Sequence, residues 1–236
     1  MMDFATDPDF WIGLLKIIWI NIVLSGDNAV VIAMAARSLR PEEQRKAIMW
    51  GSGFAVVLRI ALTFVAVQLM ALPAVQIVGG LLLLWIGSQL LGSEDETEED
   101  AKTHHNLYAA VRTILIADLV MSLDNVIGVA AAAKGNLLLL GIGLSLSIPL
   151  VIFGSSLMIG LMTRYPVIIQ LGAALIGWVA GETLISDVLV AHLISHLTWL
   201  HWLVPVACAL LVLASGRWRR TAEASTEPGD TPPAPS

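Results

Sequence analysis

The chain has 236 residues, of which 57% are hydrophobic and only 14% are charged, and its mean hydropathy is +0.80. Soluble domains carry about 25% charged residues, so this composition excludes an ordinary soluble globular protein. The formal net charge of −6 is not spread over the surface, because acidic residues are concentrated between residues 94 and 100. The single cysteine excludes an internal disulfide and a thiolate cluster for a soft metal.

Seven apolar segments approach or exceed the roughly 20 residues that a helix needs to cross a bilayer. We therefore predict an all-α polytopic membrane protein with seven transmembrane helices. Short turns that contain proline or glycine separate several segments, so consecutive helices are expected to be antiparallel neighbours. The segments are 10–36, 47–70, 73–92, 107–133, 137–162, 166–190 and 198–215.

The distribution of Lys and Arg predicts the orientation of the chain, because cytoplasmic loops are enriched in basic residues. Basic residues occupy the first loop around Arg40, the third loop at Lys102 and the tail after residue 216. The start of the chain carries none before Lys16, and the loop at 71–74 carries none at all. The N-terminus is therefore predicted outside and the C-terminus in the cytoplasm.

Polar residues recur between the first three segments and the next three. A first block recurs after 97 residues and a second block after 93 residues. Because three is an odd number of crossings, the halves should cross the membrane in opposite directions, and such inverted repeats place their substrate near the membrane midplane. The first block comprises Asn21, Ser25, Asp27 and Asn28, which recur as Asp118, Ser122, Asp124 and Asn125; the second begins at Pro73 and recurs from Pro166.

The predicted organisation thus consists of two inverted three-helix repeats plus a C-terminal helix. The acidic stretch between the halves is expected to be a solvated cytoplasmic linker, and the Pro-rich and Ser-rich end of the chain is expected to be disordered. The predicted parts are 1–92 for the first repeat, 93–106 for the linker, 107–190 for the second repeat, 191–216 for the seventh helix and 217–236 for the cytoplasmic tail.

The acids of the repeated block lie in the middle of apolar segments. A charged side chain there costs about 2.5–3.5 kcal/mol even on a lenient insertion scale, so such groups usually line a bundle interior or a water-filled cavity. Carboxylate, amide and hydroxyl oxygens are hard donors that suit Mg²⁺, Ca²⁺ or Mn²⁺. We therefore predict a midplane site for a transported divalent cation, with no prosthetic group. The predicted ligands are Asp27, Asn28, Asp124, Asn125, Ser25, Ser122, Asp118 and Glu182.

Several alternatives stay open at this stage. Glu182 either adds a third negative charge to the cation site or pairs with Arg59, the only basic residue deep in the second segment. The serines either bind the cation or hydrogen-bond between helices. Two facing aspartates would also suit an intramembrane aspartyl protease, although Leu24-Ser25-Gly26-Asp27 lacks the leading glycine of that family's motif.

Four further residues carry expectations of their own. Gly26 is expected to loosen the first helix locally and to expose backbone carbonyls as extra ligands. Asp187, near the predicted outer interface, is expected either at the surface or along the ion pathway. His192 and His196 have the i, i+4 spacing that suits one metal, although histidines at an interface are often merely solvated.

The twin motifs Ser25-Gly26-Asp27-Asn28-Ala29 and Met121-Ser122-Leu123-Asp124-Asn125 resemble those of the TerC family of integral membrane proteins, over roughly residues 10–215. Leu123 stands at the position of Gly26, which argues against a break in both helices. The resemblance implies membrane transport linked to manganese homeostasis, with export of Mn²⁺, and a historical association with tellurite resistance.

On this basis we expect a transporter rather than an enzyme, located in a bacterial inner (plasma) membrane. It would export a divalent cation by alternating access, with coupling to protons as one scheme. The expected partners are a divalent metal ion and the lipid bilayer, with no nucleic acid, and a homo-oligomer is left open.

Overall fold

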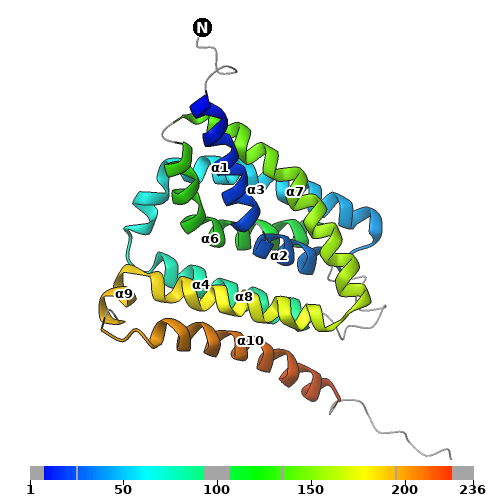
Figure 1. Cartoon of the computed structure of the whole chain (residues 1–236). Coiled ribbons are helices and arrows are strands. Elements are labelled where there is room, and N and C mark those ends of the chain that lie inside the picture. Colours follow the sequence, from blue (N-terminus) through cyan, green and yellow to red (C-terminus); the bar gives the residue numbers. More distant parts are fainter. Residues whose placement is uncertain (1–7, 25, 93–106, 134–135, 195, 225–236) are drawn as a thin grey trace, which may run out of the picture.

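The computed structural model describes residues 8–24, 26–92, 107–133, 136–194 and 196–224. Within these ranges the regular elements are all α-helices (Figure 1). This agrees with the predicted membrane protein, because backbone groups in lipid must be hydrogen-bonded within the protein. The helices are α1 (Pro8–Leu24), α2 (Gly26–Ala36), α3 (Pro41–Met70), α4 (Val75–Gly92), α6 (Leu107–Ala133), α7 (Leu137–Arg164), α8 (Val167–Ser186), α9 (Val188–Ile194) and α10 (Leu200–Ala224).

Each predicted segment coincides with a helix or a pair of helices. Among the described residues, four helical stretches are long and apolar enough to cross a membrane, and α1, α2 and α10 contain shorter apolar stretches. A multi-pass membrane protein is therefore supported, while the count of seven spans stays a prediction. The four stretches are Pro41–Ala66, Val75–Gly92, Gly141–Arg164 and Val167–Ser186.

The first predicted segment contains α1 and α2, which lie on either side of residue 25. α1 ends at Leu24 and α2 begins at Gly26, whereas α6 continues without a break through the second motif. A Cβ built at Gly26 would have no atom within 4 Å, while Leu123 in α6 is buried against neighbouring helices. The residue between α1 and α2 is not described, so the loosening expected at Gly26 stays a prediction, whereas the second motif lies within one continuous helix. Ser25 itself lies outside the described residues.

The other end of the chain also differs from expectation. α10 continues to Ala224, past the end predicted at residue 216, so the start of the predicted disordered tail is helical. The predicted sixth segment is likewise divided, because α8 ends at Ser186 and the short α9 follows. Residues 225–236 and the acidic linker lie outside the described part of the chain.

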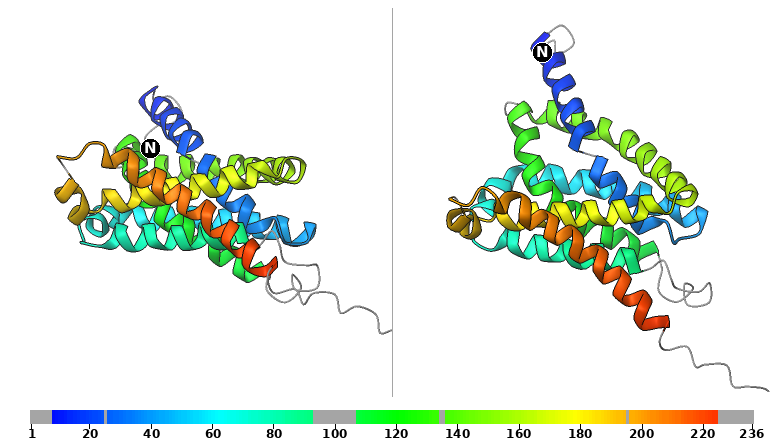
Figure 2. Two further views of the ribbon diagram at one scale, coloured as in Figure 1. Left: turned by 90° about the horizontal axis from the view of Figure 1, so that it is seen from below. Right: turned by 60° about the horizontal axis from the view of Figure 1, so that its bottom comes forward.

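Most helices pack against partners that are distant in the sequence. α4 packs along α8, which also packs along α10, while α3 packs along α6, and α1 and α2 pack along α7. Figure 1 shows α4, α8 and α10 side by side in one layer, with α1, α3, α6 and α7 on the other side of the molecule, and Figure 2 shows the same grouping. The expectation that consecutive helices are antiparallel neighbours is therefore wrong for most of the chain.

Specific contacts give the relative directions of these helices. Along the α3–α6 pair, Gly51 faces Ile114, Arg59 bonds Asp118, and the sequence numbers rise together, so the two helices are parallel. α1 and α2 likewise run parallel to α7, where Ile17 contacts Gly143 and Ala29 lies beside Gly154 further along. α4 and α8 are antiparallel, because Gly80 meets Leu184 whereas Gly87 meets Ile176.

The layer of α4, α8 and α10 depends on close approach of helix backbones. A Cβ added at Gly181 would lie 2.5 Å from the Cα of Pro205, and one added at Gly177 would lie 2.7 Å from the Cα of Ala209. Small residues at such interfaces favour helix association in lipid, where apolar side chains gain little by leaving the acyl chains. The three helices therefore form one tightly packed unit.

Asp187 ties the end of α8 to the start of α4. Its side chain is 1% exposed, and its carboxylate accepts hydrogen bonds from the backbone N–H groups of Ala74 (3.2 Å), Gln76 (3.1 Å), Ile77 (3.4 Å) and Leu189 (3.0 Å). These donors include N–H groups that the first turn of a helix leaves unsatisfied. Ala74, with φ of 68°, is held in the left-handed region by one of these bonds. Asp187 is therefore a buried residue that caps the start of α4. The sequence predicted either a surface residue or a residue of the ion pathway, and neither describes this role.

Replacing Gly181 by Val is expected to lower the melting temperature of the detergent-purified protein. Overpacking a close interface costs about 1–3 kcal/mol, and the atoms facing Gly181 belong to backbone that cannot rotate away. Gly160→Val in α7 is the matched control, because a Cβ there has nothing within 4 Å. Fluorescence-detected thermal unfolding measures both variants. An equal fall in melting temperature in both variants would contradict the close backbone packing assigned to α8 and α10.

Asp187→Asn is expected to unfold at a lower temperature than the wild type at pH 7. Burial alone would raise the pKa of Asp187, but the four backbone donors outweigh it and hold the pKa below its usual value. Such an acid stabilises the fold above its unfolded pKa of about 4 and loses this contribution as the pH falls through the folded pKa.

The loss of a helix cap costs about 0.5–2 kcal/mol, and the difference between wild type and Asp187→Asn should shrink below about pH 4. Thermal unfolding between pH 3 and pH 8 measures it, with Glu42→Gln, at an exposed position, as control. A difference independent of pH would show that the charge of Asp187 contributes nothing.

Candidate functional site

Arg59 of α3 and Asp118 of α6 form an ion pair inside the bundle. Their side chains are only 5% and 4% exposed. Arg59 Nε donates to Asp118 Oδ2 at 3.3 Å, and Arg59 Nη2 donates to Asp118 Oδ1. A planar guanidinium matches a carboxylate with two such bonds, which gives the pair a defined geometry. Both oxygens of Asp118 are therefore bound by Arg59.

This pair revises two expectations from the sequence. Asp118 was placed among the cation ligands, but in the structure its charge is already balanced by Arg59. Glu182 was the alternative partner of Arg59, but its side chain lies on the exposed surface of α8. The structure therefore assigns Arg59 to Asp118 and does not bring Glu182 into the group around the pair.

Asp27 lies in the first turn of α2. Its side chain is half-buried, and its Oδ1 accepts the N–H of Asn28 at 2.7 Å. The positive end of a helix dipole favours a carboxylate at this position. Arg59 and Asp118 both lie within electrostatic range of the Asp27 carboxylate. Three charged side chains from α2, α3 and α6 therefore share one region of the interior.

Ser122 and Asn125 continue the polar stripe of α6 beyond Asp118. Ser122 is fully buried, and its Oγ has no hydrogen-bond partner among the described residues. A buried polar group left without a bond costs about 1–3 kcal/mol, so this hydroxyl is suited to contact a bound species. The i, i+4, i+7 spacing predicts that these side chains share one face; Asp118 and Ser122 are buried and Asn125 is half-buried.

Asn125 lines a small cavity between α3, α6 and α7. The volume of about 10 Å³ is enough for one water-sized species. Arg59 and Thr63 provide its other polar groups, so the residue that bonds Asp118 also lines this cavity. Val126, Val129 and Leu144 complete the lining.

Part of the predicted ligand set is not described by the structure. The backbone of Asp124 is in α6, but its side chain lies outside the described residues, as does Ser25. Among the side chains that are described, no three of the types His, Cys, Asp and Glu come together as a metal centre. The exposed His192 and His196 therefore belong to no such group, and the pairing of Asp27 with Asp124 stays a prediction.

Sequence reasoning missed the Arg59–Asp118 pair, although a signal for it exists. The first block has Asn21 where the second has Asp118, so the second half carries one extra acid. Arg59 is the basic residue deep in the second segment, and a buried charge needs a partner. What the sequence lacks is the information that α3 and α6 are neighbours.

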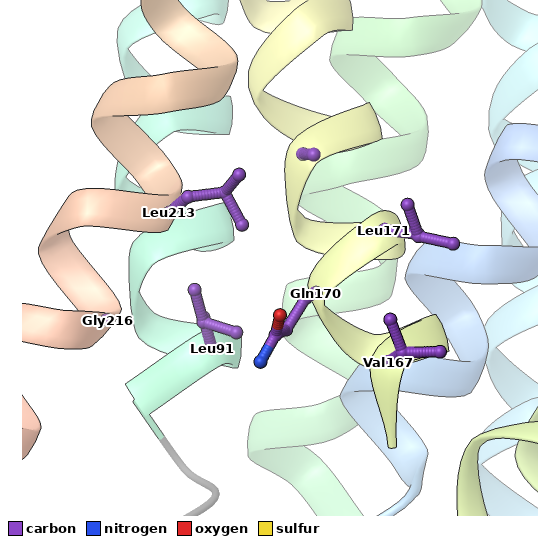
Figure 3. A pocket seen from close by; sticks show the side chains of 7 residues that line it. Leu91, Val167, Gln170, Leu171, Leu213 and Gly216 are labelled. Atoms are coloured by element: carbon purple, nitrogen blue, oxygen red, sulfur yellow. The ribbon is translucent and has the colours of Figure 1, made fainter. Parts of the chain in front are cut away.

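A larger cavity lies elsewhere, between α4, α8 and α10 (Figure 3). Its volume is about 190 Å³, and none of its lining residues is charged. Figure 3 shows Gln170 as the polar side chain among apolar ones. A divalent cation requires several oxygen donors, so this cavity does not match the predicted site. It is lined by Leu91, Val167, Gln170, Leu171, Ala174, Leu213 and Gly216.

Comparison with known proteins identifies relatives over most of the chain. The chain is 41% identical over 210 residues to the uncharacterized membrane protein YjbE of Bacillus subtilis, which covers 89% of this chain and 96% of the relative. It is 26% identical over 189 residues to a UPF0053 protein of Buchnera aphidicola, covering 72% of this chain and 36% of that protein. It is also 30% identical over 145 residues to the UPF0053 inner membrane protein YoaE of Escherichia coli, covering 53% of this chain and 28% of that protein.

The chain therefore corresponds to most of YjbE, and its matches to the longer UPF0053 proteins cover about a third of their length. No solved structure matches it. A sequence model described as the integral membrane protein TerC family matches residues 6–224. The helical architecture, the twin motifs and this match show that the chain belongs to the TerC family of integral membrane proteins.

Proposed function

We propose that this protein is a transporter that exports a divalent cation, Mn²⁺ in the first instance, across the bacterial inner membrane. The observation that carries the proposal is the group of polar side chains inside the bundle: Asp27 in the first turn of α2, with the polar stripe of α6 near it. Ionisable groups at membrane depth are costly and usually serve a pathway or a binding site. The family resemblance supplies the expectation of manganese.

The chemistry of the two motifs suits a hard divalent ion. Asp27 and Asp124 would neutralise two positive charges, while Asn28, Asn125 and Ser122 would supply neutral oxygens. Glu182 is left out of the proposed ligand set, since its side chain is exposed.

The packing of the helices supports the inverted repeat. The third helices of the two halves, α4 and α8, pack on each other, and the second helix of each half packs on the first helix of the other half. Exchanging the two halves leaves this pattern unchanged. The parallel α3–α6 and α2–α7 pairs and the antiparallel α4–α8 pair are the directions that three crossings per half require.

The same packing alters the expected motion. The two halves are interleaved, so they cannot rock against each other as separate bodies. We propose instead that the layer of α4, α8 and α10 acts as a frame, and that the helices that carry Asp27 and Asp124 move against it. No observation among the described residues favours the intramembrane protease, so the protein is proposed to be a transporter and not an enzyme.

Deleting the gene is expected to raise cellular Mn²⁺ and to increase sensitivity to added Mn²⁺, because an exporter limits accumulation. Reintroducing the full chain should restore both. Elemental analysis of washed cells measures Mn, Mg, Ca and Fe together, and purified protein in liposomes measures the flux of each ion directly. An unchanged ion profile together with no Mn²⁺ flux in liposomes would overturn the proposal.

Asp27→Asn and Asp124→Asn are each expected to reduce Mn²⁺ flux at least about tenfold, because each removes one charge that offsets the ion in a poorly solvated site. Ser122→Ala should weaken transport less, since it removes a neutral oxygen. Glu42→Gln, at an exposed position, is the matched control. Flux per folded protein in liposomes is the measurement, with folding checked by size-exclusion chromatography. Full activity in the double Asp→Asn variant would place the site elsewhere.

A further inference from the structure

We propose that Arg59 sets the net charge of the cation site, and that Asp118 is a positioning residue that holds the Arg59 guanidinium rather than a ligand of the ion. The proposal rests on the transport function proposed above and deepens it. It concerns how the net charge of the site matches the charge of a divalent ion. Neither the family match nor the motifs assign a role in this to Arg59.

The first support is the geometry of the pair. Both oxygens of Asp118 accept bonds from Arg59, and both side chains are almost fully buried. An arginine stays protonated in proteins, so its positive charge is permanent. Arg59 takes two of the roughly four lone-pair sites of the Asp118 carboxylate and balances its negative charge. A cation at Asp118 would therefore lie beside the positive charge of the guanidinium, so we assign this carboxylate to orienting Arg59.

The second support is the position of Arg59 relative to the proposed ligands. Arg59 lines the small cavity together with Asn125, a residue of the second motif. It also lies within electrostatic range of Asp27, a residue of the first motif. Its charge therefore acts on both motifs, although it belongs to neither.

The pairing of Arg59 with Asp118 determines the net charge of the proposed cation site. While Arg59 and Asp118 neutralise each other, Asp27 and Asp124 leave two negative charges, which match a divalent ion. Removing the charge of Asp118 leaves an unbalanced guanidinium that repels the ion, and removing that of Arg59 leaves a third negative charge that attracts it. In a medium of low dielectric constant these effects are large even without direct contact.

The test is Mn²⁺ binding to purified full-length protein, measured by calorimetry for four variants and expressed per folded molecule. Asp118→Asn is expected to weaken binding at least about tenfold, and Arg59→Gln is expected to tighten it by a similar factor. The double variant Arg59→Gln with Asp118→Asn restores two net negative charges and should return to within about threefold of the wild type. The matched control is Arg40→Gln and Glu43→Gln, which neutralise an exposed ion pair.

Other roles of the pair give different results. If Asp118 is a ligand, the double variant stays as weak as Asp118→Asn. If the pair only stabilises the fold, both single variants lose folded protein while Mn²⁺ affinity of the remaining protein is unchanged. Either result overturns the proposal.

A further variant covers the case in which a single neutralisation prevents folding. Arg59→Lys keeps the positive charge but loses the bidentate geometry, and its Mn²⁺ affinity is expected to stay near that of the wild type. The same is expected of the double variant Arg59→Gln with Asp118→Asn. A tenfold loss of affinity in Arg59→Lys would overturn the charge argument. If the wild-type protein binds no Mn²⁺ at all, the transport proposal itself fails. If the wild type binds Mn²⁺ but the double variant does not recover wild-type affinity, only the charge proposal fails.

Discussion

The buried Arg59–Asp118 ion pair is the interaction on which the polar interior depends. Taking two opposite charges out of water is affordable only when they are paired with good geometry, so this pair holds α3 and α6 in one register. The same register directs Ser122 and Asn125 of α6 into the bundle. It also places a permanent positive charge near Asp27. The same ion pair therefore fixes the packing of α3 against α6 and the electrostatics of the candidate site.

The two groups of helices are held together in different ways. In the layer of α4, α8 and α10, glycines allow backbone contact, and Asp187 caps the start of α4 from the end of α8. Around α2, α3, α6 and α7, buried polar and charged side chains lie between larger apolar residues. Close backbone packing favours one rigid arrangement, whereas polar groups that can exchange partners are compatible with two. This contrast is the physical reason for assigning the frame to the first group and movement to the second.

The two motifs are related in sequence but differ in structure. Gly26 is exposed at the start of α2, whereas Leu123 at the corresponding position is buried within the continuous α6. The first motif therefore places its carboxylate in the first turn of a helix, while the second lies in the interior of a long helix. The proposed site is consequently asymmetric even though it comes from a repeated sequence.

The sequence by itself determined that the chain is helical and membrane-embedded, where most helices lie, and which face of α6 is polar. Segment 107–133 coincides with α6, and the spacing of Asp118, Ser122 and Asn125 already places them on one side. Only the tertiary structure decided that Arg59 pairs with Asp118, that Glu182 is exposed and that Asp187 caps α4. The reason is that lipid is as apolar as a helix interface. Hydrophobicity therefore locates a membrane helix along the chain without revealing which neighbour each face will meet.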